Sequence, residues 1–222
     1  MKSKKYTQSF IVFCLLYMLL LIGDKEDMAW WLKPVLIPIL ISIVSVSEPF
    51  KTQKTLLLAL FCSWIGDVLL LFADQNALFF ISGLVSFLVA HLIYIYLFHQ
   101  QEIQYNRKSY LKFIPIVAVY LLVMLSFLWD TLQEMKIPVT VYAIVISMML
   151  FMSIKAFFQW GKPSNFWVLI GAILFVISDS ILAINKFHSP VPMSSFWIMS
   201  TYLGAQFCIV NSILKYNSKI LA

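Results

Sequence analysis

Residues 55–73, TLLLALFCSWIGDVLLLFA, form an apolar stretch in which Asp67 is the only charged residue. A helix needs about 20 mostly apolar residues to cross the roughly 30 Å hydrocarbon layer of a bilayer. The stretch therefore predicts a transmembrane helix that carries a carboxylate. Because a carboxylate at membrane depth costs on the order of 3 kcal/mol unless it is compensated, Asp67 marks a candidate functional position.

A second apolar stretch, residues 165–184, repeats this arrangement around Asp179. The strings Ile65–Leu70 (IGDVLL) and Ile177–Leu182 (ISDSIL) resemble each other and lie about half a chain apart. One buried acid can be structural, hydrogen-bonded to a Ser, a Tyr or the backbone of a neighbouring helix. Two acids in similar strings favour a functional site instead.

The composition shows how much of the chain lies in the membrane. It is 62% hydrophobic and 12% charged, whereas a soluble domain is roughly half apolar and a quarter charged. We therefore expect residues 1–222 to form a single integral membrane domain. The sequence shows no glycine-rich phosphate loop, no CxxC or HExxH pattern and no metal-ligand pair at i, i+3 or i+4. No cofactor and no metal site are predicted.

The sequence predicts an all-α polytopic membrane protein with eight transmembrane helices. The expected spans are residues 8–23, 30–46, 55–73, 77–98, 111–129, 137–158, 165–184 and 195–214. Twelve of the Lys and Arg residues fall on one side of these spans and four on the other, which predicts that both termini are cytoplasmic. Since this bias accounts for the net charge of +6, no nucleic-acid partner is expected.

The positions of the two acids suggest that the chain has two parallel four-helix halves. Each acid lies in the third span of its half, roughly 8 Å from the predicted outer end. The next span carries Ala90-His91 in one half and Ala205-Gln206 in the other. An internal duplication is therefore a hypothesis. Depth alone leaves open whether the two carboxyl groups face one another.

Further polar residues are candidates for substrate binding. They are Lys33, His91, Tyr94, Asn185, Lys186, Tyr202 and Gln206. Lys33 precedes Pro34 and is either a snorkelling lysine or a cation for a phosphate or one of the acids. Asn185 and Lys186 follow Asp179 toward the outer end, where they are either ordinary loop residues or ligands of a polar head group. His91 and Tyr94 share one helix face, as do Tyr202 and Gln206, and these could instead be satisfied core residues.

Several of these strings occur together in one known family. Lys33-Pro34, Gly66–Leu70, His91–Tyr94, Ser178-Asp179-Ser180 with Asn185-Lys186, and Tyr202–Gln206 resemble the YhhN family of membrane proteins, in the family's order. Ala90 precedes His91 where glycine is equally expected. The family includes the animal lysoplasmalogenases, so the resemblance extends over nearly the whole chain and implies an activity.

The resemblance implies an eight-helix hydrolase that cleaves the vinyl ether bond of lysoplasmalogens to a fatty aldehyde and glycerophospho-ethanolamine or -choline. It also implies that Asp67 and Asp179 are the acidic residues of the site. The partners would be a lysophospholipid substrate, membrane lipids and water; the oligomeric state is left open. The alternatives from the residues themselves are a binding or transport protein for lipids, small solutes or protons, and a structural membrane subunit.

Overall fold

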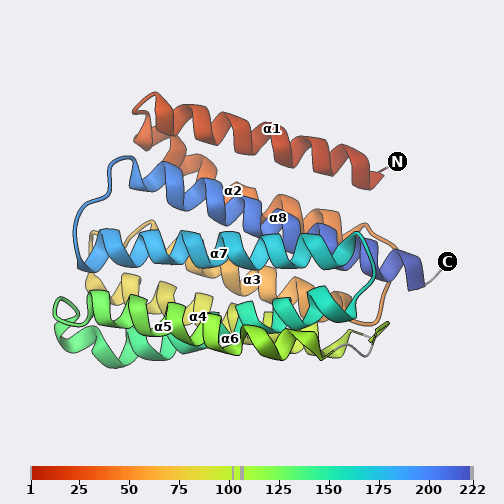
Figure 1. Cartoon of the computed structure of the whole chain (residues 1–222). Coiled ribbons are helices and arrows are strands. Elements are labelled where there is room, and N and C mark those ends of the chain that lie inside the picture. Colours follow the sequence, from red (N-terminus) through yellow and green to blue (C-terminus); the bar gives the residue numbers. More distant parts are fainter. Residues whose placement is uncertain (1, 102, 106–107, 221–222) are drawn as a thin grey trace. The chain divides into compact units, whose positions relative to one another are not determined.

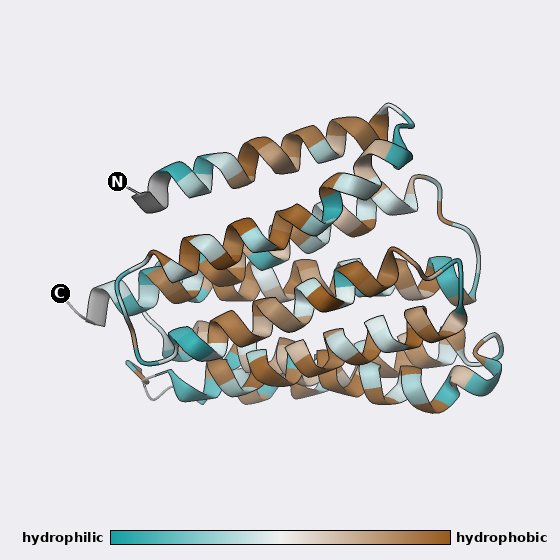
Figure 2. Ribbon diagram, turned by 180° about the vertical axis from the view of Figure 1, so that it is seen from behind, coloured by the Kyte–Doolittle hydropathy of each residue, from teal (hydrophilic) through white to brown (hydrophobic). Residues whose placement is uncertain are grey.

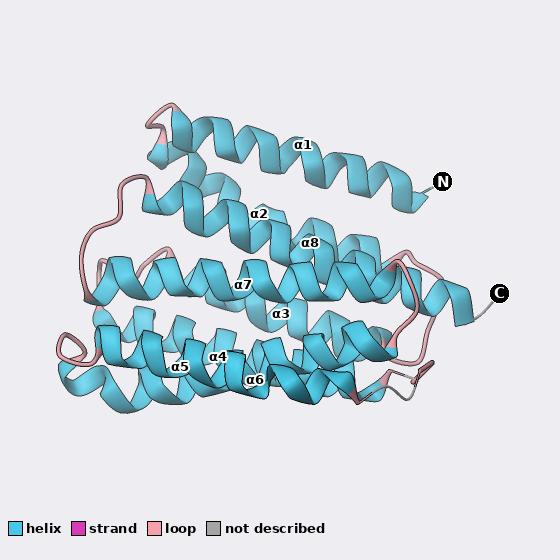
Figure 3. Ribbon diagram, in the orientation of Figure 1, coloured by secondary structure: helices cyan, strands magenta, loops and turns pink. Residues whose placement is uncertain are grey.

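The computed structural model of the chain describes residues 2–101, 103–105 and 108–220, with only the backbone described for residues 2–4 and 219–220. All regular elements in this described part are helical (Figure 3). The long helices are α1 (Lys2–Ile22), α2 (Glu26–Ser45), α3 (Gln53–Leu70), α4 (Ala77–Gln100), α5 (Ile114–Leu128), α6 (Lys136–Gln159), α7 (Ser164–Phe187) and α8 (Ser194–Ile220). Short 3-10 helices, η1 (Ser109–Phe113) and η2 (Gln133–Met135), precede α5 and α6.

All eight predicted spans are confirmed as helices long and apolar enough to cross a membrane. Apolar residues occupy most of each helix, and polar residues concentrate near the helix ends and in the loops (Figure 2). The chain is therefore an integral, multi-pass membrane protein. The all-α prediction is confirmed.

Some helix ends differ from the expected ones by several residues. α1 begins at Lys2 instead of residue 8, and α7 continues to Phe187 instead of residue 184. A hydropathy pattern detects only the apolar part of a helix, whereas polar residues beyond the hydrocarbon still form helical hydrogen bonds. α3 ends early, at Leu70, but i→i−3 hydrogen bonds of Leu71, Phe72 and Ala73 extend the turn.

The chain divides into two compact units, residues 1–97 and 98–222. The division falls in the last turn of α4, so each unit holds four of the long helices apart from that turn. This boundary coincides with the one between the two predicted halves. The proposed duplication, and the single domain expected for residues 1–222, stay predictions.

In the first unit, α1 packs on α2, and α2 packs on α3. Close contact between α3 and α4 depends on two glycines. A Cβ atom on Gly66 would lie 2.6 Å from the Phe87 ring, and one on Gly83 would lie 2.9 Å from Leu70. Small residues at such positions let membrane helices approach closely, which is the main source of packing energy in lipid.

In the second unit, α7 lies beside α8 and also packs on α6, which in turn packs on α5 (Figure 1). Gly171 lies at the α7–α8 contact, where an added Cβ would be 3.0 Å from the Ala205 carbonyl oxygen and 2.8 Å from Ile209. The hydroxyl of Ser178 donates to the Ile198 carbonyl at 2.9 Å across the same interface. These contacts fix α7, the helix that carries Asp179.

Candidate functional site

Asp67 lies on α3 and is 3% exposed. Lys33 on α2 and Tyr17 on α1 both lie close enough to interact electrostatically with its carboxyl group. Tyr17 is itself buried. A buried carboxylate requires a compensating charge or hydrogen bond, and Lys33 supplies the opposite charge. The structure thus brings together two of the candidate residues, Lys33 and Asp67.

A hydrogen bond between α2 and α3 fixes the position of Lys33. Pro38 has no backbone N–H, so the carbonyl of Pro34 loses its usual helical donor. The indole Nε1 of Trp64 donates to this carbonyl at 2.8 Å. Because Trp64 and Asp67 lie three residues apart, they share one face of α3. The bond that satisfies the proline carbonyl therefore also directs this face toward residues 33 and 34.

His91 and Tyr94 on α4 are both completely buried. His91 Nδ1 lies 2.6 Å from the carbonyl oxygen of Phe87. A carbonyl oxygen can only accept, so Nδ1 carries the hydrogen and Nε2 is the acceptor nitrogen of the neutral ring. His91 lies one turn after Phe87, which packs on Gly66, the residue before Asp67. The ring is therefore held in one tautomer close to the level of the acid.

Asp179 lies half-buried on α7. Its Oδ2 atom accepts a hydrogen bond of 2.6 Å from the hydroxyl of Tyr142 on α6. The adjacent Ser180 hydroxyl donates to the Val176 carbonyl at 2.6 Å and lies 2.8 Å from the Tyr120 hydroxyl on α5. Since Ser180 has one hydrogen, Tyr120 is the donor in that second contact. Three helices thus contribute hydroxyl groups around this acid.

A cavity of about 50 Å³ lies beside Asp179, between α5, α6 and α7. Its walls are mostly apolar: Met124, Leu125, Leu128, Val139, Ala143, Ile146 and Ala183 accompany Tyr120, Tyr142, Asp179 and Ser180. This volume has room for about three or four water-sized groups. The carboxyl group and the two tyrosines are therefore the polar features of a site suited to a hydrocarbon chain and a water molecule.

The remaining candidates of the second unit lie in different settings. Asn185 Oδ1 accepts a 2.9 Å hydrogen bond from the Val191 amide, which closes the loop after α7, and Lys186 is exposed. On α8, Tyr202 is 3% exposed and packs edge-on against Phe175 with ring centroids 5.5 Å apart. Gln206, one turn later, is completely buried. Their roles in substrate binding stay predictions.

The sequence analysis did not identify four residues that complete these two clusters, namely Tyr17, Tyr120, Tyr142 and Ser180. One signal for Tyr142 was present in the sequence. α6 and α7 form a hairpin with a short loop, and Tyr142 lies nearly as far before that loop as Asp179 lies after it. Antiparallel helices with equal rise bring such residues to one level. Tyr17 and Tyr120 carry no comparable signal.

Among the described residues, no three His, Cys, Asp or Glu side chains come close enough together to hold a metal ion. Asp67 and Asp179 lie in different units. Their partnership as a pair of facing carboxyl groups therefore stays a prediction.

The comparison with known proteins gives the relationship of the chain. The sequence profile of the YhhN family matches residues 28–213. The chain belongs to the YhhN family. This confirms the resemblance found in the sequence motifs. The matched region includes α3 to α7 and most of α2 and α8, and with them every candidate residue of both clusters except Tyr17.

Curated relatives of this YhhN-family chain carry a specific name. The human lysoplasmalogenase TMEM86B is 29% identical over 215 residues, which is 95% of this chain and 87% of the human protein. The mouse lysoplasmalogenase TMEM86B is 30% identical over 96% of this chain and 88% of its own length. A lysoplasmalogenase of Mycobacterium bovis is 30% identical over 67% of this chain and 56% of its own. No solved structure matches the chain.

Proposed function

We propose that this chain is a membrane hydrolase that cleaves the vinyl ether bond of lysoplasmalogen-type lysophospholipids. The names of its relatives support an enzyme of this ether-hydrolase class. The single structural observation that carries the proposal is the Asp179 carboxyl group, bonded to Tyr142 at 2.6 Å, on the wall of an apolar cavity. The products would be a fatty aldehyde and glycerophospho-ethanolamine or -choline.

The reaction needs one proton donor and one carboxylate. A proton is transferred to the vinyl carbon remote from the ether oxygen, and the electron pair of the double bond forms the new C–H bond. Positive charge then lies on the other vinyl carbon and the ether oxygen. Water adds to that carbon and loses a proton. The resulting hemiacetal collapses to the aldehyde and the glycerol hydroxyl, as in the related cleavage of glycosides by two carboxyl groups.

The two aspartates have neighbours that suit different roles. Asp67 lies near the Lys33 cation, which suits the carboxylate that stabilises positive charge and orients water. Asp179 has the neutral Tyr142 as donor to Oδ2 and an apolar cavity beside it. We assign Asp179 as the acid, with its proton on Oδ1. Two carboxyl groups in this reaction class act at separations of about 5 to 10 Å, so the two would have to face each other across the substrate.

The other candidates are assigned to substrate binding. Lys33, Asn185 and Lys186 would contact the phosphate head group, and His91, Tyr94, Tyr202 and Gln206 would line the polar part of the site. Both termini are proposed to be cytoplasmic, which would place the aspartates in the outer half of the membrane. Residues 1–222 are proposed to act as one membrane domain.

The test uses purified protein in detergent with lysoplasmalogen in D2O. We expect a fatty aldehyde with a single deuterium on the carbon next to the aldehyde group, trapped at once by reduction and identified by mass spectrometry. A lysophospholipid with a saturated ether and one with an acyl ester serve as controls, and neither should release product. Lipid binding without aldehyde from any substrate would overturn the proposal and favour a carrier. Cleavage of the acyl ester would replace it with an esterase.

A further inference from the structure

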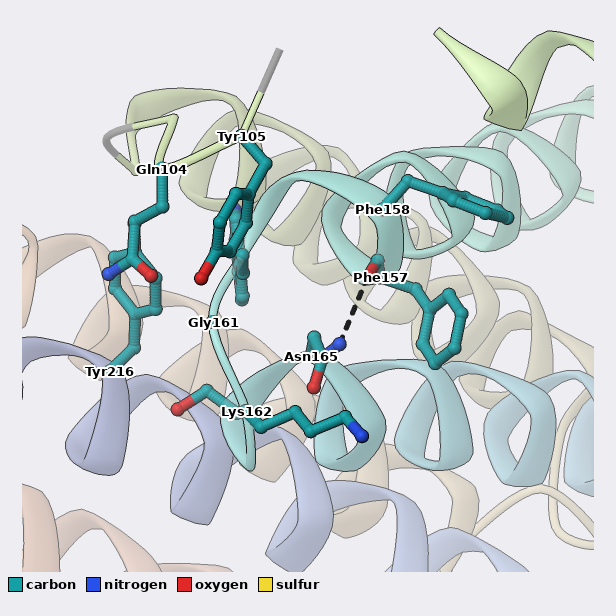
Figure 4. A pocket seen from close by; sticks show the side chains of 10 residues that line it. Gln104, Tyr105, Phe157, Phe158, Gly161, Lys162, Asn165 and Tyr216 are labelled. Atoms are coloured by element: carbon teal, nitrogen blue, oxygen red, sulfur yellow. Dashed lines mark hydrogen bonds between the residues drawn. The ribbon is translucent and has the colours of Figure 1, made fainter. Parts of the chain in front are cut away.

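A second, larger cavity of about 450 Å³ lies in residues 98–222, at the end of α7 opposite to Asp179. It is formed where α6 ends, α7 begins and α8 makes its last turns, together with the loop after α4. The lining residues are Gln104, Tyr105, Phe157, Phe158, Trp160, Gly161, Lys162, Ser164, Asn165 and Tyr216 (Figure 4). Ser164 lies 15 residues before Asp179 on one helix, roughly 22 Å away. The cavity is therefore separate from the site proposed for ether cleavage.

Hydrogen bonds hold the walls of this cavity in place. The backbone amides of Gln104 and Tyr105 both donate to the Gln159 carbonyl at 3.0 Å, which attaches the loop to the end of α6. Asn165 Nδ2 donates to the Phe157 carbonyl at 3.1 Å, as the dashed line in Figure 4 shows. Asn165 Oδ1 accepts the Phe166 amide at 2.9 Å. The cavity is thus built by specific contacts between three segments.

The polar groups at its base suit an anion. The cavity includes the beginning of α7, a helix of 24 residues whose N-cap, Pro163, provides no side-chain hydrogen bond to the first turn. The N-terminus of a helix attracts anions through its amide groups and its dipole. Lys162 adds a cation, and the lining residues include no Asp or Glu.

Ser164 provides the independent indication of a ligand. The residue is 1% exposed, and its Oγ atom has no hydrogen-bond partner among the described residues. Its backbone carbonyl, in contrast, accepts a 2.6 Å hydrogen bond from Ser212. A buried hydroxyl without a partner costs about 1 to 3 kcal/mol, so a ligand oxygen at this position would remove a penalty.

We propose that this cavity binds the phosphate of a glycerophosphate ester, in the form of the head group of a membrane phospholipid. The phosphate oxygens accept hydrogen bonds from Ser164 and from the first turn of α7, and Lys162 neutralises the charge. The volume exceeds that of a phosphate and falls in the range of small-molecule sites. Tyr105, Trp160 and Tyr216 form aromatic walls, which are typical of the depth at which head groups meet the hydrocarbon. The charge bias predicts that this end of the unit is cytoplasmic.

The test measures binding of dioctanoylphosphatidylglycerol to the full-length protein in a neutral detergent by isothermal titration calorimetry. We expect one site per chain. Ser164→Ala and Lys162→Gln should each raise the Kd about tenfold, since a hydrogen bond to a charged group contributes about that factor. Ser147→Ala removes another buried hydroxyl without a partner, on α6, and Lys155→Gln removes another lysine near the same helix end. These two matched controls should stay within about twofold of the unaltered protein.

Glycerol 3-phosphate and inorganic phosphate distinguish the source of the phosphate. Binding of the lipid alone supports a head-group site. Binding of glycerol 3-phosphate alone, with the same loss in Ser164→Ala, supports the phosphate site but assigns it to a soluble ester. Equal loss of affinity in the control variants, or no saturable binding of any phosphate, would overturn the proposal. None of these outcomes depends on ether cleavage, which Ser164→Ala should leave unchanged.

Discussion

Tyr142 and Asp179 lie at one level of the α6–α7 hairpin. Tyr142 is 17 residues before the end of α6, and Asp179 is 15 residues after the start of α7, so the 2.6 Å bond between them joins nearly equivalent positions. Lys33 and Asp67 show the same relation in the α2–α3 hairpin, 12 residues before the end of α2 and 14 after the start of α3. Each acid thus takes its compensating group from the helix that precedes it.

Tyr142→Phe should lower the turnover of lysoplasmalogen about tenfold or more while the protein stays folded. The change removes the donor to Asp179 Oδ2 and leaves the aromatic packing. The measurement is kcat and KM for aldehyde release, and kcat should carry most of the loss because the hydroxyl positions the acid. Tyr96→Phe, at an exposed tyrosine of α4, is the matched control. Unchanged kcat in Tyr142→Phe would contradict the role of Asp179 as the acid.

Asp67→Asn and Asp179→Asn should each abolish aldehyde release, because the amide can neither donate a catalytic proton nor stabilise the developing cation. Asp130→Asn changes an exposed loop aspartate and should keep full activity. Size-exclusion chromatography and circular dichroism check that each variant is folded. Full activity in either intramembrane variant would exclude the proposed pair.

Lys33→Met should destabilise the protein, because Asp67 loses its compensating charge in a buried position. The thermal midpoint in detergent is the measurement, and it shifts by roughly 2–4 °C per kcal/mol for a chain of this size. The double variant Lys33→Met/Asp67→Asn should recover part of the loss, since it removes the uncompensated carboxylate as well. Strictly additive effects in this double-mutant cycle would show that the two side chains are not coupled.

Ala143→Leu should reduce kcat/KM for lysoplasmalogen about tenfold or more by filling the 50 Å³ cavity beside Asp179. Ala118→Leu on α5, where the alanine is exposed, adds the same volume outside the cavity. Aldehyde release at several substrate concentrations provides the comparison. Equal kinetics for the two variants would place the substrate chain elsewhere.

Gly171→Ala should cost about 1–3 kcal/mol of stability, because its Cβ would meet the rigid Ala205 carbonyl oxygen at 3.0 Å. Gly204→Ala lies in the same α7–α8 interface, but its Cβ would meet only the flexible end of Leu174, at 3.2 Å. The thermal midpoint of Gly171→Ala should therefore fall clearly below that of Gly204→Ala. Equal midpoints would show that this interface adjusts freely.

The sequence by itself determined the number of helices, their approximate ends and the two positions that carry a costly charge. Each of these properties depends on local composition, because about 20 apolar residues suffice to form a span and a single Asp within it needs compensation. The predicted level of Asp67 was less reliable. α3 ends only three residues after it and α7 continues eight residues beyond Asp179, so their distances from the helix ends differ.

Only the tertiary structure decided which groups compensate the acids. The hairpin register places Tyr142 and Lys33 near their levels, but the rotation of each helix about its axis depends on packing. Trp64 bonds to Pro34 because Pro38 leaves that carbonyl without a donor, and Gly171 lets α7 lie close to α8. Such contacts join residues far apart in sequence, and no local pattern contains them. For the same reason, the cavity at the beginning of α7, made by three separate segments, was invisible in the sequence.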